Sequence, residues 1–215
     1  IFNYVNTNLS AGYLNVAKDV LYCDKKDSPR RKQVQTVMYT IGETLLRLLN
    51  PIIPFTMEEF NKNLPGKRVE HAQLLDFPKR INSVDQKYIE ATYMMLDFGF
   101  DVTKAMEEAR SNGIIGSSQE ADVYAEITDK TILELTKRTD CRESTLCSMY
   151  IVSGFHLVDK LDGGKQYKTA KIIVKHHEGH FCSRCWNYTN EGVLQEDGTY
   201  LCPRCNEVME DIKNG

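Results

Sequence analysis

The stretch His180–Asn206, with the sequence HFCSRCWNYTNEGVLQEDGTYLCPRCN, decides how the rest of the chain is interpreted. It holds two CxxC knuckles, Cys182–Cys185 and Cys202–Cys205, with sixteen residues between them. Two thiolates from each knuckle make a tetrahedral set of sulfurs about 2.3 Å from a zinc ion. Because no coordination position stays open, such an ion holds a fold and does not activate water. The predicted ligands of one structural Zn2+ are Cys182, Cys185, Cys202 and Cys205.

The composition is that of a globular protein with room for two or three domains. The chain has 215 residues, of which 41% are hydrophobic and 27% charged. No apolar run is long enough to cross a membrane, and no signal peptide opens the chain. Cys23, Cys141 and Cys147 lack partner spacing and are interpreted as reduced, apolar fillers. This pattern favours an intracellular protein, and zinc over disulfides or an iron–sulfur cluster.

The charge pattern restricts how the chain could hold nucleic acid. A net charge of −3 argues against binding by bulk positive charge, so a polyanion must meet local patches. Residues 160–185 carry six basic and two acidic residues. Arg30-Arg31-Lys32 lies in the first turn of a predicted helix, where the helix dipole disfavours positive charge. A phosphate partner would explain that run, and a solvated surface is the alternative.

Apolar periodicity predicts a helical first part. Apolar residues recur at steps of three and four over residues 2–20, and the abrupt opening of this helix suggests a sequence cut from a longer chain. Ser28 is the predicted N-cap of a second helix, which should end near Asn50. Thr56-Met57-Glu58-Glu59 has the form of a capping box for a third helix that closes at Leu64.

The second part of the chain has mixed signals. A long helix is expected over about 84–112, with a kink at Gly99, and another helix over 129–137. Alternation predicts strands at 121–127, 146–152 and 167–176, and Gly163-Gly164 predicts an antiparallel hairpin between the last two. We therefore expect a multi-domain fold of three parts. They are an all-α helical bundle at 1–80, a small α+β domain with a mainly antiparallel sheet at 81–178, and a zinc ribbon or finger at 179–215.

The sequence offers no complete active site. It lacks a nucleotide-binding GxxxxGK[ST] loop, a GxSxG elbow and an HExxH helix. His177-Glu178-Gly179-His180 resembles the histidine-rich nucleotide signature of class I aminoacyl-tRNA synthetases. That signature needs a helix after it inside a parallel sheet, whereas here a zinc knuckle follows. We interpret the histidines as a polar lead-in to the metal site and expect a non-catalytic chain.

Three residues of the knuckles could recognise RNA. Trp186, the sole tryptophan, could stack on an unpaired base or pack over the small zinc core. Arg184 and Arg204 take the same place in each knuckle. They could pair with phosphates or bases, or neutralise the negative charge of a tetrathiolate centre.

The motifs that carry a family resemblance cover nearly the whole chain. They are Asn8–Leu14 (NLSAGYL), Lys18–Asp24 (KDVLYCD), Pro51–Thr56 (PIIPFT) with Glu58-Glu59, Glu107–Arg110 (EEAR) and Cys182–Tyr188 (CSRCWNY). On these residues the chain resembles isoleucyl-tRNA synthetases of the bacterial and organellar type, from the anticodon-binding region to the C-terminus. The departures are Asn8, Gly12, Val20 and Asn50, which stand where the family usually has an acid, an aromatic ring, an arginine and an alanine.

The resemblance implies a helical bundle along the anticodon stem of isoleucine tRNA and a zinc module against the anticodon loop. It also implies ATP-dependent ligation of isoleucine in a portion that this sequence lacks. We expect a monomeric, cytoplasmic protein with no membrane contact, a mitochondrial location being the alternative. The residues expected to contact RNA are Trp186, Arg184, Arg204, Arg30, Arg31, Lys18 and Lys171.

Two other functions are weighed against this one. Gly198-Thr199-Tyr200 before the second knuckle resembles the zinc finger of formamidopyrimidine-type DNA glycosylases, which bind duplex DNA. Such an enzyme needs an amino-terminal proline nucleophile, whereas this sequence starts at Ile1. A stand-alone zinc-stabilised interaction module would leave the long helical part unexplained.

Overall fold

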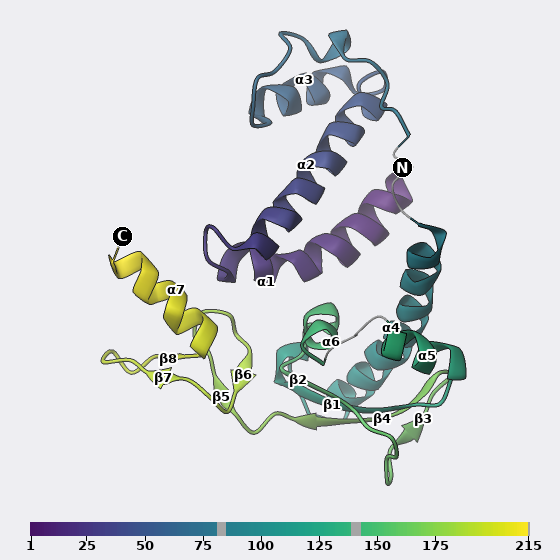
Figure 1. Ribbon diagram of the computed structural model, residues 1–215, viewed down its shortest axis with the longest axis vertical. Helices are drawn as coiled ribbons and strands as arrows, with labels where there is room; N and C mark the ends of the chain where they lie inside the picture. Colours follow the sequence, from purple (N-terminus) through teal and green to yellow (C-terminus); the bar gives the residue numbers. More distant parts are fainter. Residues whose placement is uncertain (81–84, 139–142, 215) are drawn as a thin grey trace. The chain divides into compact units, whose positions relative to one another are not determined.

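The computed structural model describes residues 1–80, 85–138 and 143–214. They form two compact units, one made of Ile1–Lys25 with Asp85–Gly215 and the other of Lys26–Val84 (Figure 1). The N-terminal helix thus belongs to the same unit as the second part of the chain. No helix in the described ranges is both long and apolar enough to span a membrane.

The unit of residues 26–84 is helical. The predicted start of α2 (Pro29–Leu49) is confirmed, because Ser28 Oγ accepts a hydrogen bond from Arg31 N at 3.5 Å and Pro29 takes the first helical position. α3 (Pro54–Asn63) and the short 3-10 helix η2 (Ala72–Leu74) follow. Their shared core is Leu46, Met57 and Ala72.

The predicted capping box at Thr56 is wrong. Ile53 is the N-cap of α3 and Pro54 takes the first helical position, so Thr56 lies inside the helix. Proline already has the backbone angle that a first turn needs, which makes a side-chain cap dispensable. Glu58 instead accepts a hydrogen bond from Ala72 N at 2.7 Å and so ties α3 to η2.

The other unit begins with a helix whose first part is π-helical. η1 (Tyr4–Leu14) continues directly into α1 (Asn15–Cys23), which ends where Asp24 becomes extended. The predicted apolar stripe is buried at Leu9 and Val20, whereas Phe2 is 78% exposed.

A long helix and a small sheet form the main core of this unit. α4 (Gln86–Ser111) starts at Asp85, whose Oδ1 accepts a hydrogen bond from Lys87 N at 3.1 Å. The helix runs without interruption through Gly99, where a Cβ atom would lie 3.0 Å from the Tyr150 ring. Glycine there allows close packing. The α4 side chains buried in the core are Met95, Phe98, Val102, Ala105, Met106 and Ala109.

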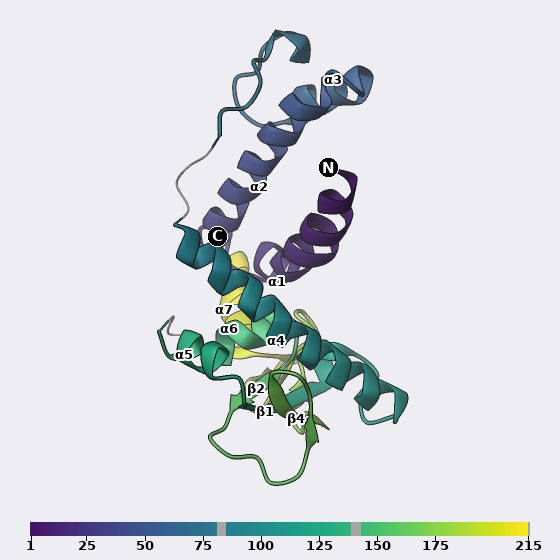
Figure 2. The same cartoon turned by 90° about the vertical axis from the view of Figure 1, so that its right-hand side faces the viewer.

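The sheet has the order β2-β1-β4-β3 in the described ranges. Its strands are β1 (Ala121–Ile127), β2 (Gly154–Leu157), β3 (Lys165–Gln166) and β4 (Ala170–His176). β1 pairs antiparallel with β4 and parallel with β2, so the sheet is mixed. The 3-10 helix η3 (Ser118–Glu120) precedes β1, and α4, α5 (Lys130–Arg138) and α6 (Glu143–Tyr150) cover one face of the sheet (Figures 1 and 2).

The strand predicted at 146–152 is wrong, because α6 covers most of that range. A short apolar run does not distinguish a strand from one face of a helix. Ile151, with a φ of 57°, follows α6, and the strand lies later, as β2. The hairpin predicted across Gly163-Gly164 is also wrong, since β2 pairs with β1 and the glycines precede β3, which pairs with β4.

The last part of this unit is built from two small hairpins and a helix. β5 (His180–Phe181) pairs with β6 (Tyr188–Thr189), and β7 (Val193–Leu194) pairs with β8 (Tyr200–Leu201). α7 (Pro203–Asn214) follows β8 directly. We call residues 179–214 the zinc module. The first CxxC knuckle is the turn between β5 and β6, and the second lies where β8 passes into α7.

Candidate metal centre and nucleic-acid interface

The four cysteines of the knuckles meet in one cluster. Their sulfur atoms all lie within 4.8 Å of one another, and Cys182 and Cys205 are fully buried. Four sulfurs about 2.3 Å from a tetrahedral ion lie about 3.8 Å apart, and the distance between Cys185 Sγ and Cys202 Sγ is 3.8 Å. The arrangement is consistent with one structural zinc ion. Bound there, zinc would supply folding free energy and leave no position open for chemistry.

The polar surroundings favour a thiolate at one cysteine of this cluster, Cys205, whereas hydrogen bonds and burial raise the pKa of Cys185 and that of Cys202. Hydrogen bonds from Cys185, Cys202 and Cys23 lower the pKa of the Cys205 thiol. Cys202 N also donates to Cys182 Sγ at 3.3 Å. Four cysteine sulfurs gathered in one cluster fit a metal that takes thiolate ligands.

A fifth cysteine reaches this cluster from α1. Cys23 is 7% exposed and packs in the same buried group as Cys182, Cys185 and Cys205. Its hydrogen bond to Cys205, with burial as the second cause, raises the pKa of Cys23. The interpretation of Cys23 as an apolar filler therefore omitted its place beside the predicted metal centre, which no spacing in the sequence indicates.

The arginine of the first knuckle binds the end of α1. Arg184 Nη1 donates to Cys23 O at 2.6 Å, and Nη2 donates to Tyr22 O at 3.0 Å. The last carbonyl groups of a helix have no partner within it and carry partial negative charge. Arg184 Nη1 also lies 3.6 Å from Cys205 Sγ. One guanidinium group thus caps α1 and faces the sulfur cluster.

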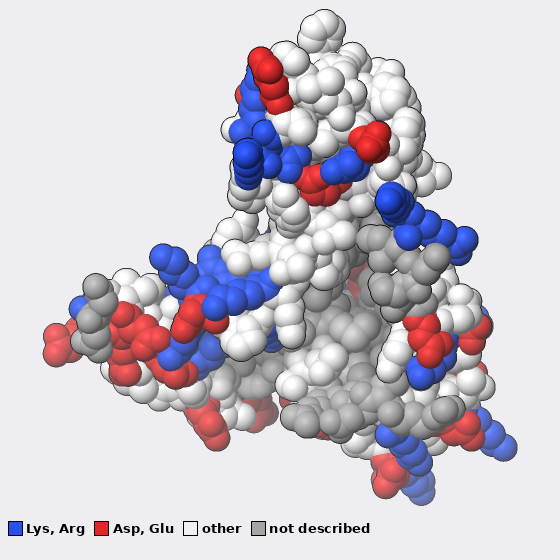
Figure 3. Space-filling model, turned by 45° about the horizontal axis from the view of Figure 1, so that its top comes forward, with Lys and Arg blue, Asp and Glu red and all other residues white. Residues whose placement is uncertain are grey.

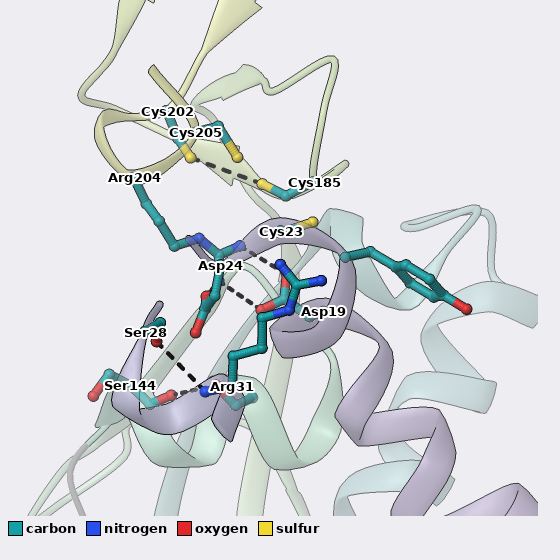
Figure 4. A network of polar contacts seen from close by, with 12 residues as sticks. Asp19, Cys23, Asp24, Ser28, Arg31, Ser144, Cys185, Cys202, Arg204 and Cys205 are labelled. Atoms are coloured by element: carbon teal, nitrogen blue, oxygen red, sulfur yellow. Dashed lines mark hydrogen bonds and ion pairs between the residues drawn. The ribbon is translucent and has the colours of Figure 1, made fainter. Parts of the chain in front are cut away.

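The arginine of the second knuckle forms a forked ion pair. Arg204 Nη1 and Nη2 lie 2.6 and 2.7 Å from the two oxygens of Asp19, and Nη1 lies 3.2 Å from Asp24 Oδ1. Figure 4 shows Arg204 reaching from the turn that bears Cys202 and Cys205 toward these two acids. Forked charge-assisted hydrogen bonds are among the stronger polar contacts in proteins.

Three further contacts hold the zinc module in place. Lys25 Nζ lies 2.6 Å from Glu207 Oε1 and 2.8 Å from Asp211 Oδ2, both on α7. Tyr188 N donates to Ser153 Oγ at 2.7 Å, which ties the module to the segment before β2. The module is therefore attached both to α1 and to the α+β part.

A cleft of about 670 Å3 lies between these elements, within a single unit of the chain. Its lining includes Lys18 and Tyr22 of α1, Ile151 and Val152 after α6, and Trp186 of the first knuckle. This volume is in the range of small-ligand pockets. Trp186 is 61% exposed, so its ring does not pack over the zinc core. Its φ of 66° is in the left-handed region, which is uncommon for a residue other than glycine.

Comparison with known proteins identifies this arrangement. The model of the anticodon-binding domain of tRNA ligases matches residues 1–125. This chain belongs to that family. A second family model, described as a zinc finger found in FPG and IleRS, matches residues 179–208. This range includes all four clustered cysteines.

Similar proteins are isoleucine–tRNA ligases. That of Staphylococcus epidermidis ATCC 35984 is 37% identical over 212 residues, which is 98% of this chain and 22% of that protein. That of Staphylococcus aureus JH9 is 36% identical over 98% of this chain and 23% of its own length. The chain therefore spans about a fifth of the length of these curated relatives, and it corresponds to their anticodon-binding and zinc-finger region.

The structure of this tRNA-ligase region gathers only some of the residues predicted to bind RNA. Lys18, Arg184, Arg204 and Trp186 all line the cleft. Lys18 is exposed, whereas both arginines make the intramolecular contacts described above. Arg30 and Arg31 lie in the first turn of α2, in the other unit.

The basic residues of the window 160–185 mainly make contacts within the chain. Lys171 Nζ donates to Leu161 O at 2.6 Å, outside the cleft lining. Lys165 pairs with Glu108 at 2.7 Å, and Lys168 pairs with Asp97 at 3.2 Å. Lys and Arg are interspersed with Asp and Glu over the face shown in Figure 3.

Sequence reasoning missed the acids that hold the zinc module. Asp19 and Asp24 belong to the KDVLYCD motif, which was used only as evidence of family. The sequence does not indicate what these two acids bind, because their partner Arg204 is far along the chain. Tyr22 was also missed, because the other residues of the cleft that it lines, such as Trp186, are far along the chain.

Proposed function

We propose that this chain binds the anticodon stem and loop of isoleucine tRNA, and that the cleft beside the zinc module receives an unpaired anticodon base. The observation that carries the proposal is the exposed Trp186 ring on a cleft that Tyr22 also lines. Membership in the anticodon-binding family supports it.

Stacking would provide the base contact. An aromatic ring held at the surface offers its face to any unstacked base, and RNA-binding proteins commonly read splayed loop bases in this way. Trp186 is 61% exposed and Tyr22 is 75% exposed, so two aromatic rings are accessible at this cleft.

Phosphate contacts would come from separate cations. Lys18 is exposed at the cleft, and Arg30 is exposed in the first turn of α2. Contacts of this kind add affinity and salt dependence without reading sequence. Arg184 and Arg204 serve chiefly to attach the zinc module, because their guanidinium groups already bind α1.

In the whole protein, ligation of isoleucine to tRNA with ATP would take place outside this region, which would select the tRNA. We propose a monomeric protein and keep the division into 1–80, 81–178 and 179–215 as a prediction. The glycosylase alternative shares the zinc finger but does not account for the anticodon-binding match over residues 1–125.

Filter binding tests this function. The chain should bind the anticodon stem-loop of isoleucine tRNA more tightly than the same stem-loop with another anticodon, at each of two salt concentrations. A preference for lesion-bearing duplex DNA would support the glycosylase instead. Equal affinity for both stem-loops would contradict base reading by this chain.

A further inference from the structure

A partly buried ion pair is one of the contacts that attach the zinc module to α1. The side chains of Arg204 and Asp19 are 33% and 30% exposed, and that of Asp24 is 10% exposed. Pairs of this kind are screened less by salt than fully exposed ones. The forked geometry also fixes the direction of the guanidinium group, which a single contact would not do.

The same ion pair is connected to Trp186 through the sulfur cluster. Arg204 directly precedes Cys205, and Trp186 directly follows Cys185. The sulfurs of these two cysteines belong to the cluster whose members lie within 4.8 Å of one another. A shift of the second knuckle would therefore move the first knuckle and the ring after it.

Three of the groups involved border the cleft. Asp19, Arg204 and Trp186 each line the cleft, together with Lys18 and Tyr22 of α1. Asp19 is one turn before Cys23, whose carbonyl oxygen binds Arg184 of the first knuckle at 2.6 Å. One end of α1 thus holds both knuckles and also supplies one wall of the cleft.

We propose that Asp19 is a positioning residue for base recognition. Acting through Arg204 and the sulfur cluster, it holds Trp186 at the cleft so that the ring meets an unpaired base without prior rearrangement. A preorganised side chain binds more tightly because less conformational freedom is lost on binding. This inference rests on the proposed function for the identity of the ligand.

The proposal predicts an effect opposite in sign to that of simple electrostatics. Asp19 carries negative charge at a site proposed for a polyanion, so its repulsion alone would make Asp19→Asn bind RNA more tightly. Positioning predicts weaker binding instead. Glu196→Gln is the matched control, since it removes one acid from the exposed surface of the zinc module and leaves the contacts with α1 intact.

The test uses the full 215-residue chain. We expect Asp19→Asn to retain zinc and to bind the isoleucine anticodon stem-loop about tenfold more weakly, given the usual strength of hydrogen bonds to charged groups. Discrimination against the swapped anticodon should fall, and Glu196→Gln should keep it. Unchanged or tighter binding by Asp19→Asn would overturn the proposal.

Fluorescence anisotropy without RNA tests the positioning step by itself. The sole tryptophan of the chain is Trp186, so its emission reports on this ring alone. Asp19→Asn should lower the anisotropy, and Asp19→Glu should restore most of it. If wild-type protein failed to discriminate anticodons while Asp19→Asn still freed the ring, the function would be wrong and the positioning role would stand.

A second variant covers the case in which Asp19→Asn loses zinc. Arg204→Lys keeps the charge but cannot form the fork. It should lower anisotropy and anticodon discrimination in the same direction, by a smaller factor. Wild-type values of both quantities in zinc-loaded Arg204→Lys would refute the inference.

Discussion

Replacing Trp186 with alanine should separate base recognition from folding. Stacking of one base on an aromatic side chain contributes about 1–3 kcal/mol, which corresponds to about a 5- to 140-fold loss of affinity for the matched stem-loop. The effect on stability should be small and could be favourable. The ring is 61% exposed, and a φ of 66° costs a residue other than glycine about 1 kcal/mol or more.

Trp186→Gly and Trp186→Phe complete the series. Glycine relieves the backbone strain and removes the ring, so it should match or exceed wild type in the free energy of unfolding while binding RNA as poorly as alanine. Phenylalanine keeps an aromatic face and should retain part of the affinity. Each variant is measured by urea unfolding and by filter binding to matched and swapped anticodon stem-loops.

Two results would refute this reasoning about Trp186. If Trp186→Ala lowered affinity for both stem-loops by the same factor, the ring would not read the anticodon. If it unfolded the zinc module, as zinc release and lost chemical-shift dispersion would reveal, the ring would be a core residue despite its exposure.

Three further perturbations address the metal, the phosphate contacts and the pH dependence. Cys182→Ser should release zinc and unfold residues 179–214 while the core of α4 and the sheet persists, because metal binding supplies folding free energy; an ordered module without zinc in NMR spectra would contradict this. Arg30→Ala should weaken binding to both stem-loops equally and reduce the slope of log affinity against log salt by about one, and a change in anticodon preference would argue against a phosphate contact. The hydrogen bond from Ala72 N lowers the pKa of Glu58 below its usual 4.5. The stability that this hydrogen bond contributes is therefore present above pH 4.5 and is lost as the pH falls through the lowered pKa. Glu58→Gln should reduce the loss of stability at acid pH, measured by urea unfolding as a function of pH. An unchanged loss in that variant would show that the bond has no such effect.

In this molecule α1 connects the cysteine cluster to the cleft proposed to bind RNA. The ion would close the two knuckles into one body, and Arg184 and Arg204 join that body to the helix end. Removal of zinc should therefore impair RNA binding even though the ion is not proposed to contact RNA. This distinguishes a metal that shapes a binding surface from one that forms part of it.

The sequence by itself determined the elements whose signals are local. The CxxC spacing identified the cysteine cluster, and Ser28 with Pro29 identified the start of α2, because capping and knuckle geometry depend on residues a few positions apart. The alternating pattern of β1 identified that strand for the same reason. The family motifs could also be identified from short stretches of sequence, and comparison with known proteins confirmed the family.

Tertiary structure alone decided the rest, because the deciding partners are distant in sequence. Most of the run at 146–152 is helical, because packing against β2 and α4 outweighed its ambiguous pattern. Asp19 has an ion-pair partner only because Arg204, far along the chain, lies against it in the fold. Charged side chains such as Arg184 and Lys171 looked available for RNA, but folding supplied carbonyl groups that bind them. A charge in a sequence shows what a residue can bind, and the fold determines which partner lies within reach.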